Sequence, residues 1–272
     1  MAAKIGSSWK TSFQGVLTLF ILGMTGVVAL AVYSVPSLRS IPELQGLSFP
    51  LLLLFAAANS TILLAVFVLF GAVTAPRIGL RSHVYAWATG RNSEWDQFRD
   101  SLRIAIGLGV VLFAIIAILD VLFAQFVRLD TGTVVSDAES LRALAESIPM
   151  RLLYGGITEE LLLRWGLMAP VAWLIWRGRV RLGISAESPS EKTMWTAIVV
   201  SAVLFGAGHL PALATNFGLT PTLIVRTVAL NSIVGLGFGW LFWRRSLETA
   251  MVAHMTFHIV LVVVSTLLIV VI

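Results

Sequence analysis

Long apolar runs separated by short polar segments dominate the pattern of this chain. Seven runs are long enough to cross a hydrocarbon core of about 30 Å, at roughly 20 helical residues each. They lie near Gln14–Ser34, Phe49–Val73, Leu102–Phe126, Ile148–Trp176, Thr193–Ala214, Thr222–Trp243 and Leu247–Ile272. None alternates like a half-buried strand, and a backbone in lipid must satisfy its hydrogen bonds within a helix or a closed barrel. The pattern predicts an all-α, polytopic membrane bundle of about seven transmembrane helices.

The composition agrees with lipid as the solvent. Hydrophobic residues make up 58% of the 272 positions and charged residues 12%, whereas a soluble domain is about one quarter charged. The formal net charge of +5 does not indicate nucleic acid, because the basic residues concentrate in alternate loops. By the positive-inside rule we expect a multi-pass protein of the cell membrane, with its amino terminus cytoplasmic and its carboxyl terminus outside.

The fourth apolar run contains Glu159, Glu160 and Arg164. An ionisable group at mid-bilayer costs about 2.5–3.5 kcal/mol on insertion scales, so each of them needs an explanation. Glu160 and Arg164 are four residues apart, on one face of an α-helix, and can pair. A buried salt bridge that fixes helix packing explains that pair. It does not explain Glu159, which is turned about 100° away without a local cation and is left free for chemistry.

Histidines lie in two further runs. His209 follows small residues in the fifth run, and alone it would be explained by a hydrogen bond within the bundle. His254 and His258, in the seventh run, are four residues apart on one face, a spacing that can hold a metal or line one side of a cavity. At about 1.5 Å per residue, Glu159, His209 and His254 all fall near the middle of the bilayer. This common depth agrees with one shared site.

Other polar residues invite structural explanations. We expect Asp120 and Arg226 near the outer ends of their helices, where the arginine can extend its guanidinium to the interface. Asn231 is deeper, and a hydrogen bond to another helix explains it better than a role as a donor behind the site. His83 lies in a basic loop, where we expect it to be solvated. Pro170 should end or kink the fourth helix soon after the arginine motif.

The motifs on these helices, taken in order, resemble the CPBP family. That family includes the type II CAAX prenyl endopeptidases and bacteriocin-processing or self-immunity proteins. Its pattern is Glu-Glu-x-x-x-Arg, then Phe-x-x-x-His, then His-x-x-x-Asn. The matching residues here are Glu159, Glu160, Arg164, Phe205, His209 and His254, while His258 stands where the family often has asparagine.

The resemblance covers roughly Ile148–Val263, and the first three runs carry no motif. We therefore divide one continuous membrane domain into three amino-terminal spans, residues 1–147, and a CPBP-like catalytic core, residues 148–272. The expected partners are the lipid bilayer and a membrane-embedded or membrane-tethered peptide or protein substrate, with no nucleic acid.

The resemblance implies an intramembrane endopeptidase that hydrolyses a peptide bond through a glutamate-activated water. Glu159 would be the general base, and Glu160 and Arg164 would orient it or bind the substrate. His209 and His254, with Glu159, would hold a zinc ion that activates the water. In a metal-free scheme, His254 and His258 would instead donate hydrogen bonds to the developing oxyanion. A histidine at 258 also adds a ligand, so we favour the metalloprotease scheme.

Two other classes of function stay open. Carboxylates and histidines in membrane helices also form proton relays, which suits a proton-coupled transporter, although no repeated halves are visible. A non-catalytic CPBP-fold protein could act as an immunity factor or a scaffold. The protease hypothesis requires Glu159, His209 and His254 to converge on one site.

Overall fold

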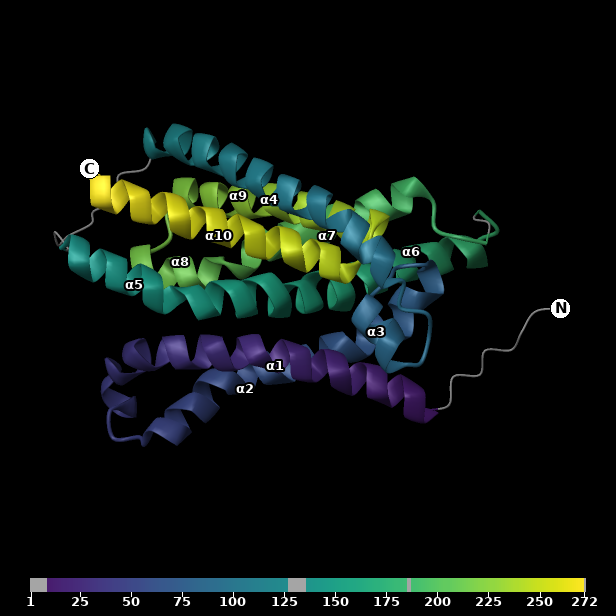
Figure 1. The fold of residues 1–272 in the computed structure, drawn as a ribbon, viewed down its shortest axis with the longest axis horizontal. Helices are drawn as coiled ribbons and strands as arrows, with labels where there is room; N and C mark the ends of the chain where they lie inside the picture. The colour runs from purple at the N-terminus through teal and green to yellow at the C-terminus, as the bar shows by residue number, and fades with distance from the viewer. Residues whose placement is uncertain (1–8, 127–135, 185–186, 272) are drawn as a thin grey trace.

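The computed structural model describes residues 9–126, 136–184 and 187–271, and these residues form helices and loops without a strand. The predicted all-α fold is therefore confirmed. The α-helices are α1 Trp9–Arg39, α2 Phe49–Thr74, α3 His83–Ala88, α4 Trp95–Ala124, α5 Asp137–Pro149, α6 Ala169–Arg181, α7 Glu191–Gly208, α8 Leu210–Phe217, α9 Pro221–Arg244 and α10 Leu247–Val271 (Figure 1). Two π-helical segments, η3 Met150–Glu159 and η4 Leu161–Met168, connect α5 to α6, and η1 Pro42–Leu44 and η2 Ala75–Ile78 are single 3₁₀ turns.

Six helices in the described part of the chain are long and apolar enough to cross a membrane. They correspond to six of the seven predicted runs. The remaining run, the fourth, lies in the continuous helical path Asp137–Arg181, where charged residues and the change of winding interrupt a single apolar α-helix. The prediction of about seven spans agrees roughly with this architecture, and the chain is a multi-pass membrane protein.

The helix that carries Glu159, Glu160 and Arg164, which we call the motif helix, is wound differently from the prediction. Its centre is π-helical rather than α-helical, on both sides of Glu160. A π-helix bonds each amide to the carbonyl five residues earlier, and such segments are rare and frequent at functional sites. Of the two outcomes predicted at Pro170, an end or a kink, the first does not occur, because the helix continues to Arg181. Pro170 lies in the first turn of α6, where a proline is tolerated, and the winding changes there from π to α.

The π-helical segment lies at the centre of the bundle. Helices α1 and α2 pack on one side of it, and α7, α9 and α10 surround the other, while α4 lies outside α9 and α10 (Figure 1). Polar side chains tie the segment to these neighbours. The Thr158 hydroxyl donates to the Gly23 carbonyl of α1 at 2.7 Å, and the Ser201 hydroxyl of α7 donates to the Leu163 carbonyl at 2.7 Å. The segment is therefore bonded to helices on both sides.

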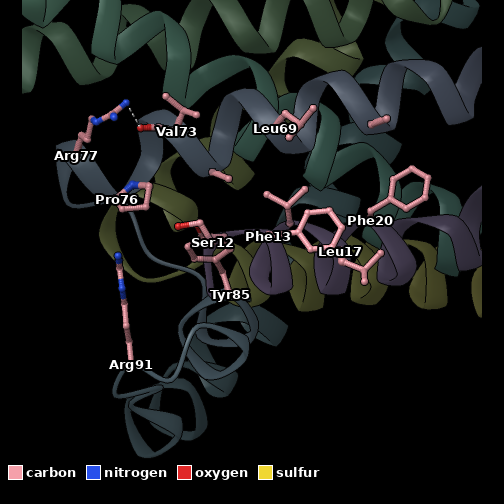
Figure 2. A pocket seen from close by; sticks show the side chains of 13 residues that line it. Ser12, Phe13, Leu17, Phe20, Leu69, Val73, Pro76, Arg77, Tyr85 and Arg91 are labelled. Carbon is pink, nitrogen blue, oxygen red and sulfur yellow. Dashed lines mark hydrogen bonds between the residues drawn. The ribbon is translucent and has the colours of Figure 1, made fainter. Parts of the chain in front are cut away.

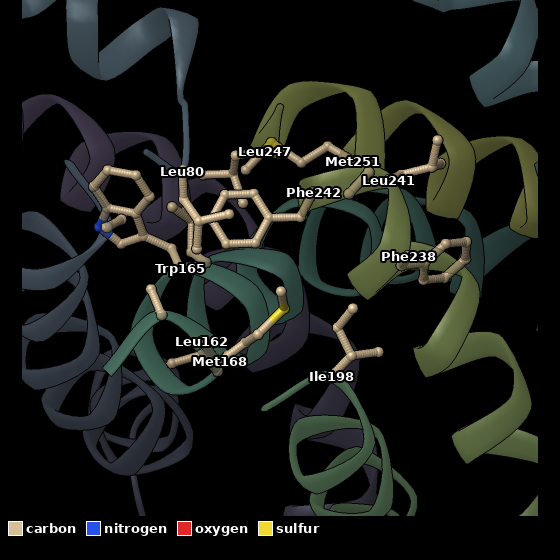
Figure 3. Close-up of a cluster of buried hydrophobic side chains, with 14 of the residues drawn as sticks. Leu80, Leu162, Trp165, Met168, Ile198, Phe238, Leu241, Phe242, Leu247 and Met251 are labelled. Carbon is tan, nitrogen blue, oxygen red and sulfur yellow. The ribbon is translucent and has the colours of Figure 1, made fainter. Parts of the chain in front are cut away.

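Trp165 anchors the apolar core beside the motif. Its side chain is fully buried, its indole nitrogen donates to the Val68 carbonyl at 3.2 Å, and its ring lies 6.4 Å from that of Phe242, between centroids. Figure 3 shows the surrounding side chains converging from the motif helix, α7, α9 and α10. The Tyr85 ring of α3 packs on Trp165, with the two ring centroids 5.2 Å apart. The core therefore joins the amino-terminal helices to the motif helix.

The short helix α3 is held by a buried carboxylate. Glu248 of α10 accepts hydrogen bonds from the Ser82 hydroxyl at 2.6 Å and from the Val84 amide at 3.1 Å. His83 is 5% exposed, contacts the Ser93 carbonyl through Nδ1 and packs on Trp95. The prediction of a solvated His83 is wrong, because α3 folds back onto the bundle and turns its histidine inward.

Close helix approach generates a stability prediction. A Cβ on Gly26 of α1 would lie 2.2 Å from the Thr158 hydroxyl and 2.4 Å from the Leu153 carbonyl, so Gly26→Leu must push α1 off the motif helix. We expect a loss of about 1–3 kcal/mol or more, measured as thermal unfolding in detergent. Gly107→Leu on α4 is the control, because nothing lies within 4 Å of a Cβ there. Equal unfolding temperatures for the two variants would contradict the packing argument.

Candidate active site

A cavity of about 830 Å³ extends from the middle of the motif helix toward the end of the bundle where α1 ends. Glu159, His209, His254 and His258 all line it. The convergence on one site that the protease hypothesis requires is therefore present in the geometry. The cavity is large enough for a segment of peptide and not only for a water molecule.

A chain of buried polar contacts lies behind the cavity wall. Arg164 and Glu160, with side-chain exposures of 1% and 0%, pair at 3.2 Å between Nε and Oε2, as predicted from their spacing. The other oxygen of Glu160 lies 2.9 Å from Nδ1 of His254, and Arg164 also donates to the Gly235 carbonyl at 3.3 Å. Neither Glu160 nor Arg164 lines the cavity. Their geometry suits positioning of His254 and gives no support to the prediction that they bind substrate.

Glu159 differs from Glu160 in its exposure and in its hydrogen bonding. Its side chain is 18% exposed and faces the cavity, and it accepts no hydrogen bond from the described residues. Its Oε2 lies 4.0 Å from Nε2 of His254. That separation exceeds a direct hydrogen bond and suits a small bridging group such as water.

The two principal histidines have their ring orientation fixed by Nδ1. His209 caps the end of α7, and its Nδ1 donates to the Phe205 carbonyl at 2.9 Å, since a carbonyl can only accept. His254 uses Nδ1 toward the Glu160 carboxylate at 2.9 Å. Each imidazole therefore keeps Nε2 for a water, a substrate or a metal ion.

Two phenylalanines hold the imidazoles, and only one was in a predicted motif. Phe205 meets both His209 and His254 edge-on, with centroids 4.8 and 6.0 Å apart. Phe238 stacks on His254 at 4.5 Å, and the Arg164 guanidinium lies over both phenyl rings. Phe238 was missed because it lies in a sixth run without an ionisable motif. Its place one helical turn after Gly235, among closely spaced glycines, was the available signal.

His258 completes the row of rings. It stacks on His254 with centroids 4.9 Å apart, and its buried Nδ1 has no hydrogen-bond partner in the described part of the chain. A Cβ on Gly155 would lie 2.7 Å from Nε2 of His258, so the glycine makes room for this ring. The motif helix and α10 thus meet closely at the cavity.

Comparison with known families agrees with this site. Residues 142–260 match the family model described as type II CAAX prenyl endopeptidase Rce1-like, which spans less than half of the chain but contains every motif residue. This segment is an Rce1-like domain. The resemblance predicted from the motifs is confirmed, and at the level of the family it supports an intramembrane protease of the CAAX type. No curated protein and no solved structure matches the chain.

The end of the Glu159 cavity near the carboxyl end of α1 carries charged side chains, and the sequence predicted the place of only some of them. Arg226 and Asp120, predicted near helix ends, pair with each other, with Nε 2.8 Å from Oδ1. Arg151 also lines the cavity and donates to the Ser147 hydroxyl at 2.9 Å. Asn231 lines the cavity too, but its amide donates to the Thr227 carbonyl of its own helix at 2.8 Å. The predicted bond to another helix is therefore wrong.

The predicted zinc ligands are His209, His254 and Glu159. The described residues contain no group of three histidine, aspartate or glutamate side chains that could hold a metal ion. The free Nε2 atoms of His209 and His254 are suitable donors singly, but the set with Glu159 does not assemble as ligands in this arrangement.

The buried ion pair of the Rce1-like domain generates a stability prediction. Arg164→Leu leaves the Glu160 charge without its guanidinium, and we expect a loss of about 3–5 kcal/mol, measured by unfolding in detergent. The matched control is Arg142→Leu, because Arg142 and Glu146 form an exposed pair at the same spacing, and it should change stability little.

The double variant Glu160→Leu/Arg164→Leu separates charge from packing. Removing both charges leaves apolar side chains, while Nδ1 of His254 loses its acceptor, so we expect part of the lost stability to return. A double variant as unstable as Arg164→Leu would contradict the explanation by an unpaired buried charge.

Proposed function

We propose that the protein hydrolyses a peptide bond in a membrane-associated protein or peptide, with Glu159 as the general base. The observation that carries this proposal is the contrast between two adjacent carboxylates. Glu160 is fully buried, with one oxygen 2.9 Å from Nδ1 of His254 and the other in an ion pair with Arg164, whereas Glu159 faces the cavity without a hydrogen bond from the described residues. A general base needs such a free carboxylate within reach of a water.

In the proposed reaction a water between Glu159 and His254 attacks the scissile carbonyl carbon. Glu159 takes one proton from the water as the carbon–oxygen bond forms, and the carbonyl oxygen becomes an oxyanion. The proton then passes to the amide nitrogen as the carbon–nitrogen bond breaks and the carbonyl re-forms, which yields a carboxylic acid and an amine. The acid then gives its proton to the amine or to water. His209 and His258 line the same cavity and are candidates to donate hydrogen bonds to the oxyanion.

Glu160 and Arg164 act in this scheme as positioning residues. Arg164 holds Glu160, and Glu160 fixes the ring of His254 through Nδ1, so that Nε2 faces Glu159. This arrangement resembles the logic of catalytic triads, in which a buried carboxylate orients an imidazole. The sequence offered two other roles for Glu160 and Arg164, orienting Glu159 or binding the substrate, and in this scheme they orient His254 instead.

Glu159→Gln tests the general base. The amide keeps the size of the side chain but cannot take a proton, so we expect cleavage of membrane-tethered peptides to fall by about 100-fold or more. Purified wild-type and variant proteins are compared on one peptide panel, with His254→Ala as a second site variant. Glu146→Gln on the exposed face of α5 is the matched control and should cleave normally.

The outcomes also separate the alternative functions. Wild-type cleavage rates in Glu159→Gln would rule out Glu159 as the base. A wild type that cleaves nothing, with folded variants that keep a cellular phenotype, would favour the immunity or scaffold function. The family match gives no support to the proton-coupled transporter.

Zinc binding stays a prediction. The location in the cell membrane and the sides on which the two termini lie stay predictions as well. If zinc is bound, it would supply Lewis-acid activation of the water. The prediction is one zinc per purified chain by elemental analysis, a lower unfolding temperature after chelation, and loss of cleavage that added zinc restores. Fully active, equally stable protein without metal would contradict it.

A further inference from the structure

A second large cavity lies at the opposite end of α1 from the Glu159 cavity. This groove has a volume of about 880 Å³ and lies between the first turns of α1 and the last turns of α2 (Figure 2). We call it the α1–α2 groove. Its wall is mostly apolar and includes Phe13, Leu17, Phe20, Leu69, Val73 and Tyr85. It shares no lining residue with the Glu159 cavity.

Two arginines mark one end of the groove. Arg77 and Arg91 lie on either side of Pro76, while the phenylalanine and leucine side chains extend away along α1 and α2 (Figure 2). No carboxylate is among the 13 lining residues. Arg77 donates to the Val73 carbonyl at 2.6 Å, and neither arginine forms an ion pair with the described residues. The end of the groove therefore carries two positive charges that no lining residue neutralises.

The apolar part of the groove is open to the surroundings. Phe13 and Leu69 are 50% and 51% exposed, and Leu17 is 42% exposed, although they lie on helices long enough to span the membrane. Such a surface is stable against hydrocarbon and costly against water. Arg77 lies in η2, just beyond the end of α2, and Arg91 lies in the loop that follows α3. The groove is thus apolar along its length and cationic at the end where α2 stops.

We propose that the α1–α2 groove binds one glycerophospholipid with an anionic headgroup, its phosphate between Arg77 and Arg91 and an acyl chain along Phe13, Leu17 and Leu69. The charge complementarity argues for this occupant, because basic pockets between membrane helices recognise anionic headgroups. Guanidinium groups suit phosphate in particular, since they donate in a planar fork. The apolar wall distinguishes a lipid from a free anion.

The proposal goes beyond the proteolytic function and does not depend on it. No residue with a proposed role in cleavage lines the groove, so lipid binding and peptide cleavage can fail separately. Tyr85 forms part of the groove wall and also packs on Trp165, so an occupant would complete the packing around the motif helix from outside.

Native mass spectrometry of the purified full chain tests the proposal. The protein is mixed with equal amounts of phosphatidylglycerol and phosphatidylcholine that carry the same acyl chains. We expect a wild-type preference for phosphatidylglycerol of about 10-fold, because each arginine near the surface adds roughly a few-fold or more in affinity. Arg77→Gln/Arg91→Gln should abolish that preference, and Arg77→Lys/Arg91→Lys should keep part of it.

Control variants make the result specific to the groove. Arg99→Gln/Arg103→Gln removes the same charge from exposed positions at the start of α4 and should keep the preference. Ala72→Trp fills the groove and should reduce binding of both lipids, whereas Val121→Trp, 68% exposed on α4, should not. An unchanged preference in Arg77→Gln/Arg91→Gln would overturn the proposal. Inorganic phosphate that displaced the lipid at equal concentration would also overturn it, in favour of a free-anion site.

Discussion

The contact between Arg164, Glu160 and His254 is the interaction on which the rest of the site depends. A buried charge in a bundle surrounded by lipid is costly unless it has a partner, and here one carboxylate forms an ion pair with a guanidinium through one oxygen and contacts an imidazole through the other. The motif helix and α10 cannot move apart without breaking this chain. The same contact fixes which nitrogen of His254 faces the cavity.

Aromatic side chains and hydrogen bonds from neighbouring helices surround these three residues and hold them in place. Phe205 and Phe238 cover the Arg164 guanidinium, which keeps water from the pair, and both rings also contact His254. Hydrogen bonds from Ser201 and to Gly23 then hold the π-helical segment between α7 and α1. Adjacent side chains on a helix are turned by up to about 100° from each other, so Glu159 and Glu160 can face different surroundings, one the cavity and the other the protein interior.

Sequence alone predicts the parts of this molecule that depend on local spacing. The apolar runs predict the helices, and the four-residue interval predicts the Glu160–Arg164 pair, because both follow from helix geometry. The π-helical winding and the stack of Phe238 on His254 depend on how distant helices meet, and no local pattern encodes them. The prediction of a solvated His83 was wrong for the same reason, since its burial requires Glu248, 165 positions later, to hold α3.

The departure of His258 from the family's asparagine is accommodated by the shape of the helix interface. The ring needs more room than an asparagine side chain, and Gly155 provides it, because even a single methyl group there would collide with Nε2. The ring then stacks on His254 and continues the row that begins at Phe238. It remains in the cavity wall beside Glu159, with a nitrogen able to donate, so the position keeps the hydrogen-bonding capacity that the asparagine would supply.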